Sequence, residues 1–219
     1  MKIIELKETI TASNDRDAEV LRGELKAKGT LLINLMASPG AGKTTLLERT
    51  IRDLGNELKI AVMEADVDSD VDAVRIEKTG AKAVQAHTDG MCHMDAGMTR
   101  RALEGLGDEP FDLVVLENVG NLICPAEFDT GAGKRVMLLS VPEGDDKPLK
   151  YPLMFRVSDV LIITKTDVLP YFDFDAEACK ARARKLNPDV TIFEVSAKTG
   201  DGFAEWEAWV KEQVRDWKA

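Results

Sequence analysis

A glycine-rich segment between an apolar run and a helical pattern constrains this chain more than any other feature. Residues 31–36 are almost wholly apolar, and they are followed by Ala37-Ser38-Pro39-Gly40-Ala41-Gly42-Lys43-Thr44-Thr45. Glycines let the backbone curl so that consecutive N–H groups point at one anion, with the positive end of the next helix behind them. The segment therefore predicts a phosphate-binding loop between a strand and a helix.

Apolar runs alternate with helical patterns along most of the chain. The expected strands are residues 30–36, 59–64, 82–86, 111–117, 135–141, 159–164 and 190–195. Helical patterns fall near 44–54, 69–78, 95–106, 174–186 and 201–216. An amphipathic helix over 13–28, opening at Ser13 or Asn14 and closing at Gly29, is expected before them. Most runs are apolar on both faces, as in parallel strands covered by helices on both sides. The pattern predicts a doubly wound α/β fold of the P-loop NTPase type, with a mostly parallel sheet of about seven strands.

The length, charge and composition of the chain limit its domain organisation and its possible partners. No repeat or linker-like tract divides the 219 residues, so we expect a single domain over 1–219. Lys and Arg total 29 against 39 Asp and Glu, and the net charge of −10 disfavours nucleic acid as a partner. No run approaches the roughly 20 apolar residues that span a bilayer. Three cysteines do not suggest a disulfide framework, so we expect a cytoplasmic protein with no membrane partner.

The phosphate loop assigns roles to its residues. We expect Lys43 to neutralise the β- and γ-phosphates and the Thr44 hydroxyl to bind Mg²⁺. Ala37 replaces the usual first glycine of the motif. The residues expected to contact the nucleotide here are Gly40, Ala41, Gly42, Lys43, Thr44 and Thr45.

Two carboxylates stand where the carboxyl edge of the sheet is expected. Asp66 and Glu117 each end an apolar run, and Mg²⁺ prefers oxygen ligands, so both are candidates for magnesium binding and, with Lys43, for catalysis. The N–H of Gly120 could reach the γ-phosphate. The alternative is that each carboxylate is an ordinary exposed strand end.

Two later strand ends are suited to reading a base. One carries Lys165 and Asp167, and the other carries Ser196-Ala197-Lys198. A carboxylate only accepts hydrogen bonds, and the guanine edge presents two neighbouring donors, so Asp167 predicts GTP and GDP as ligands. The stem of Lys165 could cover the base, and the Ala197 N–H could meet guanine O6. The pair resembles the Asn-Lys-x-Asp and Ser-Ala-Lys motifs of GTPases, with Thr164 in place of Asn.

Cys92, His93 and Cys124 are candidates for a transition-metal site. Thiolate sulfur and imidazole nitrogen suit Ni²⁺ or Zn²⁺ better than Mg²⁺. A closed site would need a fourth ligand from Asp95, water or a second subunit. Spacing alone favours two buried cysteines and a hydrogen-bonded histidine, and Cys179 lies on a helical pattern typical of core.

Several stretches together resemble the HypB family, SIMIBI-class GTPases that serve nickel insertion into [NiFe]-hydrogenase. They are Asn34 to Thr44, Cys92 to Ala96, Glu117 to Ala126 and Glu143 to Pro152. The Cys-Pro-His motif typical of UreG, the urease counterpart, is not found. The resemblance implies a GTP-promoted homodimer that binds nickel or zinc at Cys92, His93 and Cys124. It also implies a HypA-type nickel chaperone and an immature hydrogenase large subunit as partners.

The sequence thus predicts a slow GTPase that acts as a metallochaperone. Two alternatives stay open at this point. One is a P-loop kinase acting on a metabolite, and the other is a regulatory GTP switch whose thiols are structural. Residues 1–30 contain no cysteine or histidine, so we expect no nickel-storage segment there.

Overall fold

In the part of the chain that the structure describes, seven parallel strands form one sheet in the order β3-β2-β4-β1-β5-β6-β7. The computed structural model describes residues 6–66, 71–88 and 90–219, and for residues 6–10, 66 and 71 it describes the backbone alone. The strands are β1 (Leu31–Ala37), β2 (Ile60–Asp66), β3 (Lys82–His87), β4 (Leu113–Glu117), β5 (Lys134–Ser140), β6 (Val160–Thr164) and β7 (Thr191–Val195). The predicted α/β fold with about seven mostly parallel strands is confirmed.

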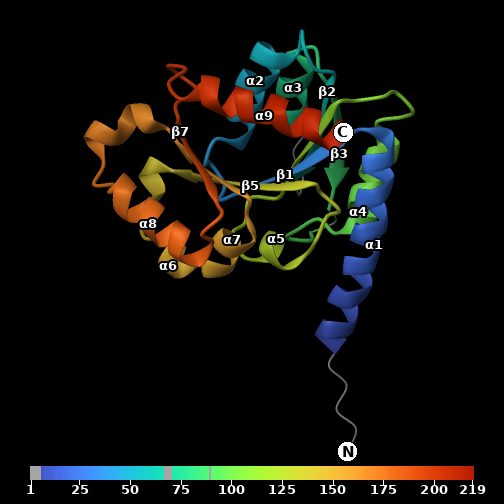
Figure 1. Ribbon diagram of the computed structural model, residues 1–219, viewed down its shortest axis with the longest axis horizontal. Helices are drawn as coiled ribbons and strands as arrows, with labels where there is room; N and C mark the ends of the chain where they lie inside the picture. The colour runs from blue at the N-terminus through green and yellow to red at the C-terminus, as the bar shows by residue number, and fades with distance from the viewer. Residues whose placement is uncertain (1–5, 67–70, 89) are drawn as a thin grey trace, which may run out of the picture.

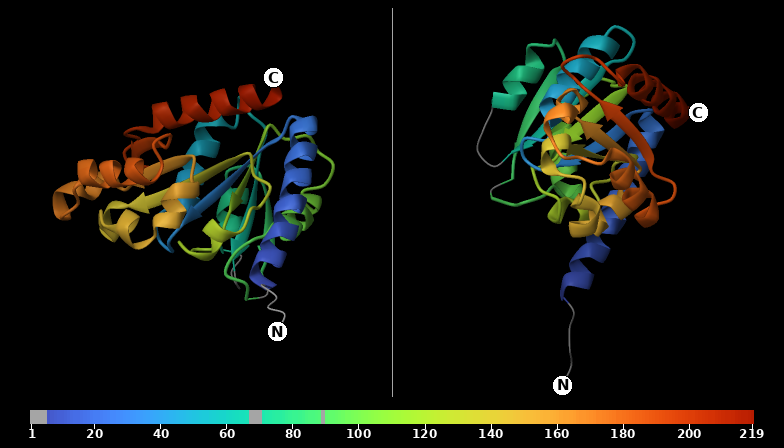
Figure 2. Two further views of the ribbon diagram at one scale, coloured as in Figure 1. Left: turned by 60° about the horizontal axis from the view of Figure 1, so that its bottom comes forward. Right: turned by 90° about the vertical axis from the view of Figure 1, so that its left-hand side faces the viewer.

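Helices cover both faces of the sheet, as Figures 1 and 2 show. Helices α2, α3 and α9 lie on one face, and α1 with α4 to α8 lies on the other. The helices are α1 (Leu6–Lys28), α2 (Lys43–Leu54), α3 (Val71–Glu77), α4 (Ala96–Gly105), α5 (Cys124–Glu127), α6 (Lys147–Lys150), α7 (Pro152–Val157), α8 (Ala176–Leu186) and α9 (Phe203–Lys218), with 3-10 turns η1 (Val141–Glu143) and η2 (Thr166–Tyr171). Among these helices, none is both long and apolar enough to cross a membrane.

The side chains of each strand alternate between the two faces of the sheet and contribute to a hydrophobic core on each face. Leu31, Ile33 and Leu35 of β1 pack with α2 and α9, whereas Leu32 packs with α1 and α4. Both sets are buried because successive side chains of a strand point to opposite faces. The continuous apolar runs of the sequence follow from this two-sided burial.

Helix α1 is longer than predicted. The sequence suggested a start at Ser13 or Asn14, but the helix begins at Leu6. Asn14 does not cap the helix, because its side chain instead bonds Ala96 and Asp129 in other segments.

The short helices α5, α6 and α7 were not predicted, although each has a proline in its first turn, a position that favours helix starts.

Candidate nucleotide and metal sites

The phosphate loop leaves the central strand β1 and turns into α2. Gly40 and Gly42 have φ of 74° and 100°, a left-handed region that favours glycine. Helix α2 begins at Lys43, and no described side chain caps its first turn. Its first N–H groups are thus left for an anion, as phosphate binding at a helix N-terminus requires.

Lys43, Thr44 and Glu117 meet in a cavity of about 550 Å³ that Gly40, Gly42, Thr45 and Gly120 also line. The Thr44 hydroxyl donates to Glu117 Oε1 at 2.9 Å, and Lys43 Nζ lies 3.8 Å from the same oxygen. Burial raises the pKa of Glu117, and the charge of Lys43 opposes that shift. Glu117 Oε2 is buried and accepts no hydrogen bond from an N–H or hydroxyl group of the described residues. A hydroxyl beside such a carboxylate oxygen fits Mg²⁺.

Glu64 is a site residue that the sequence reasoning missed. It lies on β2 directly opposite Glu117 on β4, is only 3% exposed and lines the same cavity. Burial raises its pKa, and the adjacent Glu117 raises it further. The signal was a carboxylate inside an otherwise apolar strand, Ile60 to Ala65. The predicted ligand Asp66 ends the same strand, but its side chain lies outside the described residues.

An arginine also reaches the phosphate cavity. Arg75 of α3 donates to the Thr45 hydroxyl at 3.3 Å and pairs with Glu48 at 2.6 Å and Asp72 at 3.1 Å. Its two acidic partners hold the guanidinium at the rim of the cavity. The sequence offered no pattern that singled out this arginine, because Glu48 and Thr45 come from another helix.

The base-reading segments form a second cavity, of about 210 Å³, next to the first. The Ser196 hydroxyl donates to Asp167 Oδ1 at 2.8 Å, and Ala197 and Lys198 line the cavity with Asp167. Lys165, at φ 61°, donates from Nζ to the carbonyl of Gly40 at 2.7 Å. Gly42, Thr45 and Lys165 line both cavities, so a base and its phosphates would occupy adjoining spaces.

Thr164 connects the base segment to the phosphate loop. Its hydroxyl donates to the carbonyl of Ala41 at 2.7 Å, and the residue is buried. The threonine that replaces the usual asparagine thus keeps a hydrogen bond to the loop through its hydroxyl.

Cys92, His93 and Cys124 come together although they belong to two segments. Their ligand atoms all lie within 4.8 Å of one another, and Cys92 Sγ lies 3.7 Å from His93 Nδ1. Burial lowers the pKa of His93, which favours the neutral, metal-binding ring. A hydrogen bond with the Cys124 thiol raises the pKa of Cys92, so metal binding must release a proton.

The fold gives Asp95 and Cys179 structural roles. The Asp95 carboxylate, considered above as a fourth metal ligand, caps α4 by accepting from Met98 N at 2.7 Å, so it already has a partner. Cys179 is buried in the core, and burial raises its pKa to about 12, as expected of an inert thiol.

Asn118 and Gly120 connect the two sites. The side-chain amide of Asn118, directly after Glu117, donates to Asn34 of β1 at 3.0 Å, and its oxygen accepts from Met94 N at 3.3 Å. A Cβ on Gly120 would come within 2.9 Å of the Pro39 ring, so only glycine allows this approach to the phosphate loop. The segment after β4 therefore contacts both the phosphate loop and the residue after His93.

Comparisons with known proteins agree over nearly the whole chain. A family model for the CobW/HypB/UreG nucleotide-binding domain matches residues 31–194. Hydrogenase maturation factor HypB of Azotobacter chroococcum is 48% identical over 212 residues, which cover 97% of this chain and 70% of that protein. The crystal structure of HypB from Archaeoglobus fulgidus has a TM-score of 0.86 at 43% identity, over 93% of this chain and 99% of that one. HypB from Helicobacter pylori, solved in complex with nickel, has a TM-score of 0.88 at 38% identity, over 93% and 96%.

The fold, the phosphate loop and the matched model define a P-loop nucleotide-binding protein of the CobW/HypB/UreG class. Identities of 48% and 42% over 97% of this chain narrow the class to one family. The chain belongs to the HypB family of hydrogenase maturation factors, and it is a GTPase of that family. The family favours the GTPase over the metabolite kinase.

Proposed function

We propose that this chain, acting as a single domain, couples GTP hydrolysis to the transfer of nickel into an immature hydrogenase large subunit. The observation that carries the proposal is the convergence of Cys92, His93 and Cys124 within 4.8 Å. Cys124 stands on the segment that begins at Glu117 of the phosphate cavity. The nickel complex of the Helicobacter pylori relative supports nickel as the cargo.

Hydrolysis would depend on positioning and charge rather than on a covalent step. Lys43 would face the β- and γ-phosphates, Gly120 N–H would meet the γ-phosphate, and Asp167 would select guanine. Thr44, Glu117 and Asp66 would hold Mg²⁺, which supplies positive charge to the phosphates when bound. Lys43, Asp66 and Glu117 are the proposed catalytic set.

Cys92, His93 and Cys124 would bind nickel during its transfer and could bind zinc when no nickel is being transferred. Soft thiolates and a neutral imidazole suit both ions, and three donors leave a position for a further ligand. Met91 and Ile123, each beside a ligand residue, are exposed by 45% and 57%. Exposed apolar side chains around an incomplete site support a GTP-promoted homodimer that closes over the metal.

The proposed partners are a HypA-type nickel chaperone and the hydrogenase large subunit, and family membership supports both. The proposed location is the cytoplasm. Cys92, Cys124 and Cys179 are free thiols, as is common in a reducing compartment. The net charge of −10 supports a protein rather than a nucleic-acid partner.

Metal titration of the full chain tests the proposal. Wild type should bind nickel or zinc at one site per chain or one per dimer, and Cys124→Ala should lose that binding while it keeps GTP turnover. Sedimentation with GDP and with a non-hydrolysable GTP analogue measures dimerisation in parallel. Metal binding unchanged in Cys124→Ala would leave a regulatory GTPase with structural thiols.

A further inference from the structure

We infer that helix α1 sets the spacing between the two metal-ligating segments, and that Asn14 is the positioning residue. The inference rests on the proposed metal site and adds a residue to which neither motif nor resemblance pointed. The two segments are defined here as residues 92–96, which carry Cys92 and His93, and residues 124–129, which begin with Cys124.

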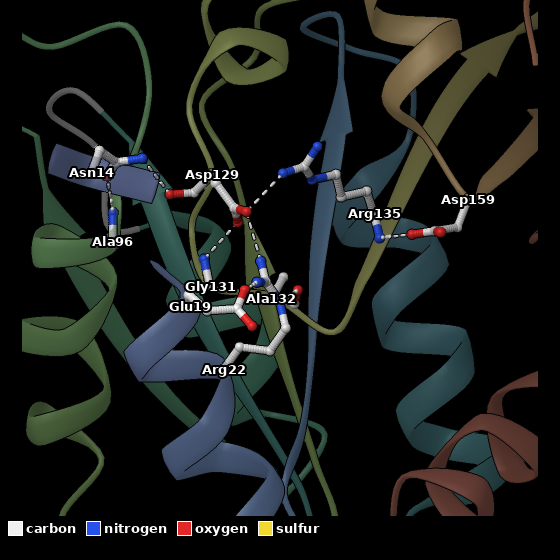
Figure 3. A network of polar contacts seen from close by, with 9 residues as sticks. All are labelled: Asn14, Glu19, Arg22, Ala96, Asp129, Gly131, Ala132, Arg135 and Asp159. Carbon is white, nitrogen blue, oxygen red and sulfur yellow. Dashed lines mark hydrogen bonds and ion pairs between the residues drawn. The ribbon is translucent and has the colours of Figure 1, made fainter. Parts of the chain in front are cut away.

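Asn14 bonds both segments at once (Figure 3). Its Oδ1 accepts from the backbone N–H of Ala96 at 2.9 Å, and its Nδ2 donates to the backbone carbonyl of Asp129 at 2.9 Å. One partner can only donate and the other can only accept, so the orientation of the amide is defined. A single side chain thus joins the residue three after His93 to the residue five after Cys124.

A second attachment holds the same part of α1. The Asp129 carboxylate accepts from Arg22 Nη2 at 2.6 Å and from Gly131 N at 2.9 Å, and Arg22 Nε donates to the carbonyl of Ala132 at 3.0 Å. Asn14 and Arg22 are eight residues apart, or about 12 Å along the helix axis. Both side chains bond Asp129, so the end of the segment that begins at Cys124 is held from two points of the helix.

The position of Asp129 also affects the histidine ligand. Its neighbour Phe128 stacks on His93, with ring centroids 3.8 Å apart and planes at 15°. Asn14 therefore influences the site in two ways, through the backbone that places Cys124 and through the ring that orients His93. Without Asn14 the two segments would keep the Asn121 hydrogen bonds and the His93–Phe128 stack, but they could separate at Ala96 and Asp129. Metal binding would then have to restore that spacing. Lost preorganisation weakens binding without removing a ligand.

Asn14→Ala tests the inference, and Asn14→Asp is a second variant that keeps the acceptor for Ala96 but cannot donate to Asp129. Nickel and zinc affinities of the GDP form are measured by competition with a chromophoric chelator. We expect both variants to bind about tenfold more weakly than wild type, the low end for outer-shell partners of a metal. In metal-free protein, a trivalent arsenical that bridges two thiols should capture Cys92 and Cys124 more slowly in both variants.

Glu24→Gln is the matched control. Glu24 ties α1 to Arg100 of α4 at 2.5 Å and lies outside both metal-ligating segments. It should leave metal affinity and arsenical capture at wild-type values, and GTP turnover and circular dichroism should match wild type in every variant. A purely structural role for Asn14 would lower thermal stability while affinity and capture stayed unchanged.

The outcomes separate the two proposals. Wild-type affinity and capture rate in folded Asn14→Ala and Asn14→Asp would overturn the inference about α1, while loss of binding in Cys124→Ala still upheld the site. Binding unchanged in Cys124→Ala would overturn the metal site itself. A tenfold loss in Glu24→Gln would also overturn the specific role of Asn14.

Discussion

The side-chain amide of Asn121 donates a hydrogen bond to the backbone carbonyl of Cys92 across 3.3 Å. The same side chain accepts from the N–H of Ile123, the residue before Cys124, at 2.8 Å. Asn121 directly follows Gly120, whose backbone lies against Pro39 of the phosphate loop. The Asn121 side chain therefore joins both thiol-bearing segments, and its backbone continues directly from Gly120 of the phosphate cavity.

This contact predicts that nucleotide state changes metal affinity. If Gly120 moves to meet a γ-phosphate, Asn121 moves with it, and Cys124 cannot keep its place relative to Cys92. We expect nickel and zinc affinities to differ between the GDP form and a non-hydrolysable GTP form by about 5- to 150-fold, with the reciprocal effect on nucleotide. Asn121→Ala should reduce the difference, and titrations at a fixed assembly state measure it.

Cys124→Ala serves as the control for this coupling, because it removes the ligand and not the connection. Identical affinities in the two nucleotide states of wild type would contradict the coupling. A full wild-type difference in Asn121→Ala would show that the route runs elsewhere.

Asp167→Asn should change the base that is bound. The carboxylate pairs with two guanine donors, whereas the new amide can donate to the C2 oxygen of xanthine. We expect GTP affinity to fall by about 100-fold and xanthosine triphosphate to bind instead, since two hydrogen bonds to a charged group are lost. Calorimetry with both nucleotides measures the exchange, and unchanged GTP affinity would refute the role of Asp167.

Lys43→Ala should abolish GTP turnover. The ammonium lies in the phosphate cavity 3.8 Å from Glu117, and removal of a positioned charge from the reacting phosphates should cost at least about 100-fold in kcat. Phosphate release measures turnover, and circular dichroism must first show that the variant is folded. Turnover at the wild-type rate would mean that Lys43 serves the fold alone.

Glu64→Gln should separate stability from magnesium dependence. Because burial and Glu117 raise the pKa of Glu64, its carboxylate form destabilises the nucleotide-free protein, and that cost grows as pH rises above the ordinary value of 4.5. The variant should melt at a higher temperature than wild type at neutral pH without nucleotide. It should also need about tenfold more Mg²⁺ for half-maximal turnover. An unchanged Mg²⁺ requirement would remove Glu64 from the site.

Asp129→Asn should lower stability in a pH-dependent way. Burial raises the pKa of Asp129, but Gly131 N–H, Arg135 and Arg22 outweigh it and hold the pKa below its ordinary 3.8. Such a group stabilises the fold above the unfolded-state pKa, and the contribution is lost as pH falls through the folded-state pKa. The variant should lose about 1 to 3 kcal/mol at pH 7. Urea unfolding should show that the difference in free energy of unfolding between the variant and wild type shrinks as pH falls below the ordinary pKa of 3.8. A difference that does not change with pH would contradict this role of the Asp129 carboxylate.

Much of the nucleotide site follows from local sequence. The positive φ values of Gly40 and Gly42 favour glycine whatever the rest of the fold is. A short motif in the sequence is therefore enough to identify the phosphate loop. The strands are equally local, because burial on both faces leaves continuous apolar runs such as Leu31 to Met36. Lys165, Asp167 and Ser196 were found because each stands just after a strand, at the edge where ligands of parallel sheets bind.

Contacts between distant segments were decided by tertiary structure alone. Glu64 lies opposite Glu117 only because β2 pairs with β4. The sequence of neither strand determines which strand becomes its neighbour in the sheet. The spacing of Cys92 and Cys124 in the sequence could not show whether the two thiols meet. Their distance depends on how β4 and the elements beside it are placed in the fold. Asn14 looked like a helix cap, since a polar residue bonds its own backbone when nothing else is near. Packing of α1 against α4 placed Ala96 and Asp129 within reach instead, and hydrogen bonds follow proximity in space rather than in sequence.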